Sequence, residues 1–365
     1  MTTRRAGFTI IELLVVVSII ALLVGILLPA IGKARDQAQV SVSQANLRQL
    51  GAAHGSYGAE WQDRQFTLID ANMADYGSLA ATAFSQYEDE NGMAHPPILL
   101  GWAKKFSTGQ YLLWQLGSPG LSAYQPITFV PASGTGGERF GSFRLPNVKQ
   151  FNQYTCGRFY HPMYYAPKSV AVTDFVKGAF ESPYEYRLKE QQGGSIAWCS
   201  YALSPAAMFS PDVMRNSEAG GWQDPWQVGG SFRTPGFSQA LYPSLKTHML
   251  EHSWLQNTQG TQCNPAFGTV GTYDGCEPWY FNHAWESSPV TLFYDGHVEG
   301  VGVRAAMRAD GRMRAQTGDP EWGLWSKDTA WGEDGYFIDI GYDQAATSFH
   351  ILTTEGIRGR DVTAN

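Results

Sequence analysis

The sequence predicts an α+β fold in which one long N-terminal helix packs on a head made mainly of antiparallel β-sheet with long loops. An uncharged apolar run from Leu13 to Gly32 leads directly into a stretch with helical spacing that ends near Glu60. Farther along, two β-rich runs flank Asp295-Gly296, a pattern typical of a hairpin turn. With 365 residues, the chain is long enough to add a large head to such a helix.

The apolar run is long enough to cross a membrane. From Leu13 to Gly32 it holds 20 residues without a charge, and at about 1.5 Å per residue such a helix spans roughly 30 Å, the thickness of a bilayer core. Arg4 and Arg5 precede the run, and basic residues favour the cytoplasmic side. We therefore expect a single span, with everything beyond Ala34 on the far side.

Glu12 lies at the edge of this run, with no basic residue within a helical turn on its C-terminal side. A carboxylate inside the membrane costs on the order of 2–3 kcal/mol on insertion scales. An unprocessed anchor gives no reason for that cost. An ordinary signal peptide gives none either, and it would be cut after the run, where only Gly32-Lys33-Ala34 is available. We therefore expect Glu12 to have a partner or a function.

The stretch Gly7-Phe8-Thr9-Ile10-Ile11-Glu12, between basic residues and the apolar run, resembles the class III signal of type IV pilins and type II secretion pseudopilins. The resemblance implies that a prepilin peptidase cuts between Gly7 and Phe8 and that the new amine of Phe8 is N-methylated. It also implies that Glu12 pairs with the N-terminal amine of a neighbouring subunit. Pro29 matches a position where the anchor helix of this family bends or loosens in filaments.

The helix should continue beyond the membrane, because Lys33 to Trp61 holds no proline and its apolar residues recur at helical spacing. We expect about 50 helical residues, near 75 Å in length. The first half would serve membrane and filament, and the second half would pack on a sheet. The expected organisation is a leader at 1–7, a membrane-spanning and filament-core helix at 8–32, its amphipathic continuation at 33–61 and a head at 62–365.

The head reads as short strands and loops. From Asp63 to about Gln192 there is no long amphipathic helical pattern, and Gly, Pro and aromatic residues separate short apolar runs such as 97–100 and 127–130. Further strands are predicted at 195–202 and 349–353.

The strongest local signal in the head is Asp295-Gly296 between two β-rich runs. It predicts a type I′ hairpin turn, in which both central residues need positive φ. Together with His297, this pair resembles the C-terminal signature of a group of large pseudopilin-like bacterial proteins, in which a His is followed by nine residues and then Asp-Gly. Here eleven residues separate His283 from Asp295.

Composition and motifs exclude several functions. The chain has 26 basic and 33 acidic residues, so it is a poor candidate for binding nucleic acid, whose phosphates are bound chiefly by Lys and Arg. It has no Gly-x-Ser-x-Gly, Walker or G-x-G-x-x-G motif of an enzyme. His248, Glu251 and His252 fit the H-x-x-E-H pattern of zinc peptidases, which requires a helix; we expect an incidental strand or turn here.

The four cysteines form no C-x-x-C pair, so no zinc knuckle is predicted. On the far side of the membrane the compartment favours disulfides. We expect Cys263 to pair with Cys276 across a short glycine-containing loop, and Cys156 with Cys199. Buried thiols are the alternative.

The acidic tail offers a candidate calcium site at Asp328, Glu333 and Asp334. Their carboxylates are hard oxygen ligands, and some type II secretion pseudopilins, which the signal resembles, bind calcium through loop carboxylates. A solvated acidic loop is the alternative. No other cofactor is expected.

These observations predict a structural subunit, not an enzyme, of a type II secretion pseudopilus or type IV pilus-like filament. The resemblance implies a bacterial inner-membrane protein with its head in the periplasm. Its partners would be like subunits, the prepilin peptidase, the inner-membrane assembly machinery and lipid. The alternative is a membrane-tethered surface protein that binds glycan through an aromatic-rich head, by stacking on Trp322, Trp325 or Trp331.

Overall fold

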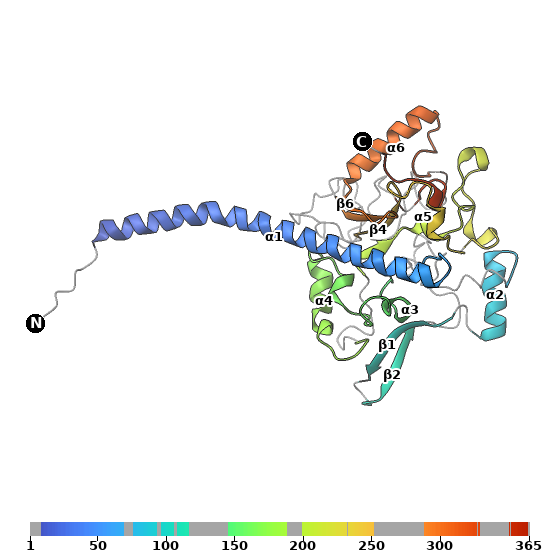
Figure 1. Ribbon diagram of the computed structural model, residues 1–365, viewed down its shortest axis with the longest axis horizontal. Helices are drawn as coiled ribbons and strands as arrows, with labels where there is room; N and C mark the ends of the chain where they lie inside the picture. Colours follow the sequence, from blue (N-terminus) through green and yellow to red (C-terminus); the bar gives the residue numbers. More distant parts are fainter. Residues whose placement is uncertain are drawn as a thin grey trace, which may run out of the picture.

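The computed structural model of the chain describes residues 9–68, 76–92, 96–105, 108–116, 145–187, 199–231, 233–251, 288–326, 328, 350 and 352–363. Across these residues the architecture is mixed α+β, with one very long helix and two antiparallel sheets. Figure 1 shows the first half of the helix projecting from the head and the second half lying across it. The fold class predicted from the sequence is confirmed.

The long helix, α1 (Ile10–Glu60), is unbroken over 51 residues, about 77 Å at 1.5 Å per residue. Pro29 lies inside it, and the missing N–H of this proline leaves the Gly25 carbonyl without its intrahelical donor. After the helix, Gln62 and Asp63 adopt φ values of 56° and 68°, which turn the chain back toward the head. The predicted end near Glu60 is confirmed.

The main sheet has the strand order β3–β4–β5–β6, and each strand is antiparallel to its neighbour. The strands are β3 (Tyr201–Leu203), β4 (Thr247–Glu251), β5 (Val290–Phe293) and β6 (Val298–Gly300). The second half of α1 contacts β5 and β6. A Cβ on Gly51 would lie 3.0 Å from Leu292 Cδ2 of β5, so glycine allows the helix to lie close to the sheet here.

A second sheet is a two-stranded antiparallel ribbon of β1 (Ile98–Lys104) and β2 (Tyr111–Leu116), with an irregularity between Leu99 and Gly101. It confirms the strand predicted at 97–100. The helix α3 (Lys149–Asn152) contacts β1. Among the other short helices are α5 (Pro205–Met208) and the 3₁₀ turns η3 (Pro162–Tyr164), η4 (Ser217–Ala219), η5 (Pro225–Gln227), η6 (Phe237–Gln239) and η9 (Gly356–Arg358).

Three helices were not expected from the sequence: α2 (Ala80–Asn91), α4 (Val170–Phe180) and α6 (Val303–Thr317). The first two lie in the region predicted to hold only short strands and loops, so that prediction is wrong there. Both are short, with 12 and 11 residues, and α4 mixes β-branched residues with a glycine, which lowers helix propensity.

The other predicted strands have different outcomes. Only the end of 195–202 is described, and there Tyr201 begins β3; the segment 127–130 lies outside the described residues. The closing strand at 349–353 is wrong over its described residues, which form only an isolated bridge between Trp325 and Thr353. His350 has a φ of 73°, which breaks an extended run.

The chain between β5 and β6 forms a hairpin at Asp295-Gly296, but the turn is not type I′. Gly296 has a φ of 89°, whereas Asp295 is not among the residues with positive φ. The Gly296 N–H donates to the Phe293 carbonyl at 3.0 Å, and the Phe293 N–H donates to the His297 carbonyl at 3.0 Å. The loop therefore has three residues and ends in a left-handed glycine, the second common hairpin arrangement.

Replacing Gly296 by alanine should lower the free energy of unfolding by about 1–2 kcal/mol, because a Cβ at positive φ is strained. Gly311, inside α6 with no heavy atom within 4 Å of a Cβ placed there, supplies the control. Gly311→Ala should raise stability by about 0.5–1 kcal/mol, because alanine favours helix. Denaturant unfolding of a fragment of residues 33–365 measures both. Equal effects, or effects of opposite sign to these, would contradict the turn assignment.

Candidate functional site

The N-terminal end of α1 is closed by Thr9 and Glu12. The Thr9 hydroxyl accepts from the Glu12 N–H at 3.2 Å, while the Glu12 carboxylate accepts from the Thr9 N–H at 2.8 Å and from its hydroxyl at 2.7 Å. This reciprocal capping box satisfies donors that a helix start leaves open. The pattern Thr-x-x-Glu before an apolar run is the sequence signature of a capping box. The energetic cost of a carboxylate in the membrane does not by itself point to this partner of Glu12. Glu12 therefore has a partner within its own chain.

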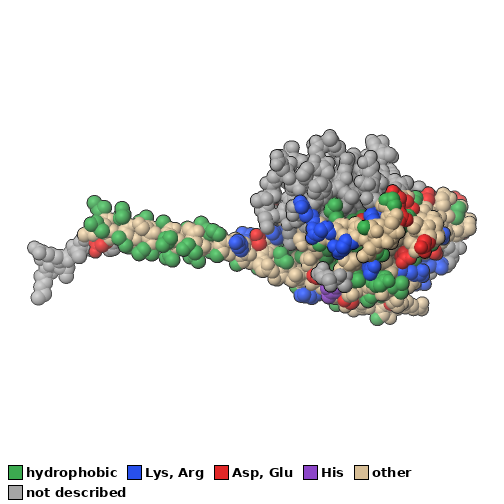
Figure 2. Space-filling view, turned by 90° about the horizontal axis from the view of Figure 1, so that it is seen from above, with side chains coloured by type: hydrophobic (Ala, Val, Ile, Leu, Met, Phe, Trp, Pro, Cys, Tyr) green, Lys and Arg blue, Asp and Glu red, His purple; other side chains and the backbone are tan. Residues whose placement is uncertain are grey.

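The first half of α1 is an exposed apolar rod. Its most hydrophobic 18-residue window has a mean hydropathy of 3.1, and none of that window is buried against the rest of the described chain. Ile10 is 84 % exposed and Leu28 is 64 % exposed, and Figure 2 shows apolar side chains along this projecting part. Water solvates such a surface poorly. By length and composition, lipid or other apolar helices suit it.

The second half of α1 buries one face in the head. Its buried positions recur every three or four residues, which places them on one side of the helix. They are Ser43, Asn46, Leu47, Leu50, Ala53, His54 and Gly58. Leu47 and Leu50 are 0 % exposed and belong to the main hydrophobic core.

Two polar side chains of this face bind to the sheet. Ser43 Oγ donates to Glu251 Oε1 of β4 at 2.5 Å and lies 2.9 Å from the Tyr201 hydroxyl of β3. Asn46 Nδ2 donates to the same hydroxyl at 3.2 Å. The Val290 N–H of β5 donates to the second Glu251 oxygen at 3.0 Å. We call Ser43, Asn46, Tyr201 and Glu251 the docking cluster; its members are all buried.

Glu251 makes the docking cluster sensitive to pH. Burial raises the pKa of Glu251 to about 7 from its usual 4.5, although hydrogen bonds from Ser43 and the Val290 N–H oppose the rise. Between these two pH values the folded state binds more protons than the unfolded state. Glu251 therefore lowers stability progressively as pH rises from about 4.5 to 7.

Farther along α1 from this cluster, His54 meets His248 of β4 edge to face, with ring centroids 4.8 Å apart. Burial, helped by the Lys246 charge, lowers the pKa of His248 to about 3, and burial lowers the pKa of His54 well below 6.5. Both rings are therefore neutral near pH 7. As pH falls below about 6.5, the two histidines are protonated in the unfolded chain but not in the folded one, so the fold loses stability. This pH dependence is opposite in sign to that of Glu251.

The zinc-peptidase pattern does not form a zinc site. Residues 247–251 are the buried strand β4 rather than a helix, as the preferred interpretation expected. His248 contacts His54, Phe237 and Tyr294, whereas Glu251 bonds to the docking cluster. His252 lies outside the described residues. Over the described part of the chain, no three His, Cys, Asp or Glu side chains are placed to hold a metal.

A buried ion pair, not predicted from the sequence, fastens the C-terminal segment to β4. Lys246 Nζ lies 2.9 Å from Asp361 Oδ2, and both side chains are 0 % exposed. The lysine also donates to Thr353 Oγ1 at 2.7 Å and to Ser204 Oγ at 3.0 Å. Burial alone would raise the pKa of Asp361, but the Lys246 charge and the Thr353 hydroxyl hold it below its usual value.

The predicted disulfide between Cys156 and Cys199 is not formed in the structure, where both side chains are thiols. The Cys199 thiol is buried and donates to the Tyr164 carbonyl at 2.9 Å, whereas the Cys156 thiol donates to the Arg158 carbonyl at 3.6 Å. Each sulfur is thus held by a backbone carbonyl. The pair Cys263 and Cys276 lies outside the described residues.

Of the candidate calcium ligands, only Asp328 is described; Glu333 and Asp334 lie outside the described residues. Asp328 accepts a hydrogen bond from the Trp222 N–H at 2.9 Å. Burial raises its pKa, although this backbone hydrogen bond opposes the rise. The calcium site stays a prediction.

The alternative prediction, that glycan stacks on exposed tryptophans, is wrong for two of the three tryptophans named for it. Trp322 is 8 % exposed and Trp325 is 1 % exposed, so neither offers an open ring face. Trp325 forms a backbone bridge to Thr353 of the C-terminal segment, whereas Trp322 forms one to Ser326. Trp331 lies outside the described residues.

The hairpin residues form a small surface unit. His297 Nδ1 lies 2.5 Å from Asp295 Oδ1, and the imidazole stacks on Phe293 with centroids 4.3 Å apart. His283 lies outside the described residues, as do Gly7 and Phe8, so the structure does not place the expected cleavage site.

Comparison with known proteins reaches only the N-terminus. The model of the prokaryotic N-terminal methylation motif matches residues 2–28, which include Thr9, Glu12 and most of the apolar run. No curated protein and no solved structure matches the chain significantly.

The docking cluster can be tested through its pH dependence. Glu251→Gln keeps an oxygen that accepts from Ser43 but removes the titration. Relative to the parent, the variant should gain about 2–3 kcal/mol more stability at pH 8 than at pH 5. Denaturant unfolding of residues 33–365 at both pH values measures this, and the histidines cancel because both proteins keep them. Glu299→Gln, at an exposed carboxylate of β6, is the control; parallel profiles for Glu251→Gln and parent would contradict the burial argument.

Proposed function

We propose that the chain is a structural subunit of a type II secretion pseudopilus or a type IV pilus-like filament, because its N-terminus matches the prokaryotic N-terminal methylation motif. One observation carries the proposal. The methylation motif at 2–28 includes the start of a single 51-residue helix, which is apolar and exposed in its first half and part of the head core in its second. This rod joins an apolar assembly segment to a folded head within one helix, as a structural subunit requires.

The proposed life cycle starts with a membrane-inserted precursor. Residues 8–32 span the bacterial inner membrane once, and the head at 62–365 lies in the periplasm. A prepilin peptidase removes residues 1–7 by cutting between Gly7 and Phe8, and the new amine of Phe8 is methylated. The processed subunit then leaves the bilayer with the help of inner-membrane assembly machinery and joins like subunits.

In the filament, we assign Glu12 the role of setting the axial register between subunits. An apolar helix slides along similar helices at little cost, whereas a carboxylate among apolar side chains strongly favours one position opposite a cation. The amine of Phe8 on a neighbouring subunit supplies that cation. The capping box with Thr9 is compatible with this role, because a carboxylate has about four acceptor positions and only part of them serve the cap.

Glu12→Gln separates the two roles of this residue. Glutamine preserves the capping box, in which Glu and Gln are interchangeable, but it removes the charge that pairs with an amine. We expect Glu12→Gln subunits to be inserted and cut normally and to assemble at least 10-fold less than the parent. Filament yield in sheared surface fractions and by electron microscopy measures assembly, and the mobility of the processed chain measures cleavage.

Thr9→Val supplies the matched control, because it removes the side chain of the cap and keeps the Glu12 charge. It should weaken the first helical turn by about 1 kcal/mol and leave assembly near the parental level. If Glu12→Gln assembles normally while Thr9→Val fails, Glu12 acts through the helix cap and the register role is incorrect.

A further inference from the structure

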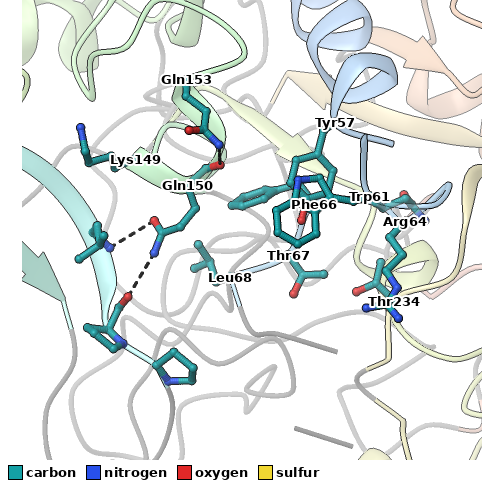
Figure 3. Close-up of a pocket in the computed structure, with 14 residues that line it drawn as sticks. Tyr57, Trp61, Arg64, Phe66, Thr67, Leu68, Lys149, Gln150, Gln153 and Thr234 are labelled. Atoms are coloured by element: carbon teal, nitrogen blue, oxygen red, sulfur yellow. Dashed lines mark hydrogen bonds between the residues drawn. The ribbon is translucent and has the colours of Figure 1, made fainter. Parts of the chain in front are cut away.

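A cavity of about 490 Å³ opens beside the C-terminal end of α1, on the head. Its walls come from the last turn of α1, the chain at 64–68, the start of β1 and α3, as Figure 3 shows. It lies at the opposite end of α1 from Glu12 and the apolar rod. A cavity of this size matches small-molecule and sugar sites, which fall in the range of roughly 300–1,000 Å³.

An aromatic platform forms the centre of the cavity. Trp61 is 47 % exposed, although its ring is stacked on Tyr57 with centroids 5.7 Å apart. The Trp61 indole N–H donates to the Tyr154 hydroxyl at 2.9 Å, which in turn donates to Glu60 at 2.6 Å. The indole is thus fixed at its polar edge while much of its surface stays open. Phe66, 3 % exposed, forms an apolar floor beside it.

Two polar groups on one side of the cavity have no protein partner among the described residues. Thr234 is only 6 % exposed, yet its hydroxyl makes no hydrogen bond there. The Arg64 guanidinium likewise has neither an ion-pair nor a hydrogen-bond partner within the described ranges. Figure 3 shows these two side chains near each other, across the aromatic rings from Lys149 and Gln153. A buried hydroxyl without a partner costs stability, which a ligand hydroxyl would recover.

The lining carries a positive charge in an acidic protein. Among the described residues that line the cavity, Arg64 and Lys149 are the charged ones, and none is a carboxylate. Lys149 is neutralised by Glu185 at 2.7 Å, so Arg64 carries the remaining charge. The chain as a whole is acidic, with 33 acidic and 26 basic residues, whereas the cavity is locally positive. The positive charge favours a ligand with a carboxylate and disfavours a cation.

The cavity is poorly suited to a peptide that adds as a β-strand. The β1 edge that faces it is already used: the Leu99 N–H donates to Gln150 Oε1 at 3.3 Å, and Gln150 Nε2 donates to the Pro97 carbonyl at 3.1 Å. Farther along, the Trp102 N–H donates to Glu185 at 3.1 Å. Strand addition needs a row of open backbone groups, so recognition here falls to side chains and ring faces.

We propose that this cavity binds an acidic saccharide, a sugar with a carboxylate, through a site separate from the filament-forming helix. Trp61 stacks against the apolar face of a sugar ring. Thr234 and Gln153 bond to ring hydroxyls, and Arg64 pairs with the carboxylate. An acidic sugar thus offers a partner to each of these side chains: an apolar ring face, hydroxyls and a carboxylate. Binding of the sugar does not depend on filament assembly.

Isothermal titration of the full processed chain in lipid nanodiscs tests the site, since glycoside detergents would compete. The probes are oligogalacturonates, oligoglucuronates and sialyllactose, with maltotriose and lactose as neutral counterparts. At least one acidic probe should bind at least 10-fold more tightly than its neutral counterpart. Arg64→Gln should remove this preference, and Trp61→Ala should weaken binding at least 10-fold.

Thr234→Val provides a second test of the binding site that remains valid if Trp61→Ala disturbs folding. Valine has nearly the shape of threonine and loses only a hydroxyl that has no described partner, so the thermal midpoint should hold while binding weakens several-fold. Trp102→Ala, at a 37 % exposed tryptophan outside the cavity, should leave binding unchanged. Any of three results would overturn the proposal: no acidic probe binds, octanoate binds as tightly as the best sugar, or binding survives Thr234→Val and Trp61→Ala unchanged.

Discussion

The contact between the second half of α1 and the sheet is the constraint on which the rest of the molecule depends. Leu47 and Leu50 are core residues, and Ser43 bonds to Glu251 deep in the sheet. Because the same unbroken helix carries the exposed apolar rod, this contact determines how the head is attached to the segment that we propose enters a membrane or a filament. A helix that detached from the sheet would uncover the core and uncouple the head at the same time.

The contact uses buried polar groups as well as apolar packing, and that choice has a physical consequence. Apolar side chains alone would allow α1 to shift along the sheet, whereas hydrogen bonds from Ser43 and Asn46 fit one position. Burying Glu251 raises its pKa to about 7, while burying His248 lowers its pKa to about 3. The two groups change the stability of the fold in opposite directions as pH changes, so each offsets part of the other's effect between about pH 4.5 and 6.5.

The sequence predicts local features of this structure far better than long-range ones. The extent of α1 is predicted by the apolar run and by the helical spacing of the apolar residues that follow it. The position of the hairpin is predicted by Asp295-Gly296. The turn type does not follow, because Tyr294 joins the loop and the number of loop residues decides which positions need positive φ. Lys246 and Asp361 lie far apart in the chain and have no shared pattern, so their ion pair becomes visible only in the fold. The same holds for the cavity at Trp61, whose walls come from separate segments.

The mass of the N-terminal peptide of the protein purified from bacterial membranes tests the central claim most directly. Our account predicts a peptide that begins at Phe8 and carries one extra methyl group on its amine, because residues 1–7 are removed before the helix can enter a filament. A peptide that begins at Met1 or Thr2 would contradict it, since Glu12 would then face no neighbouring amine. A start near Ala34 would contradict it as well, because the apolar half of α1 would be lost.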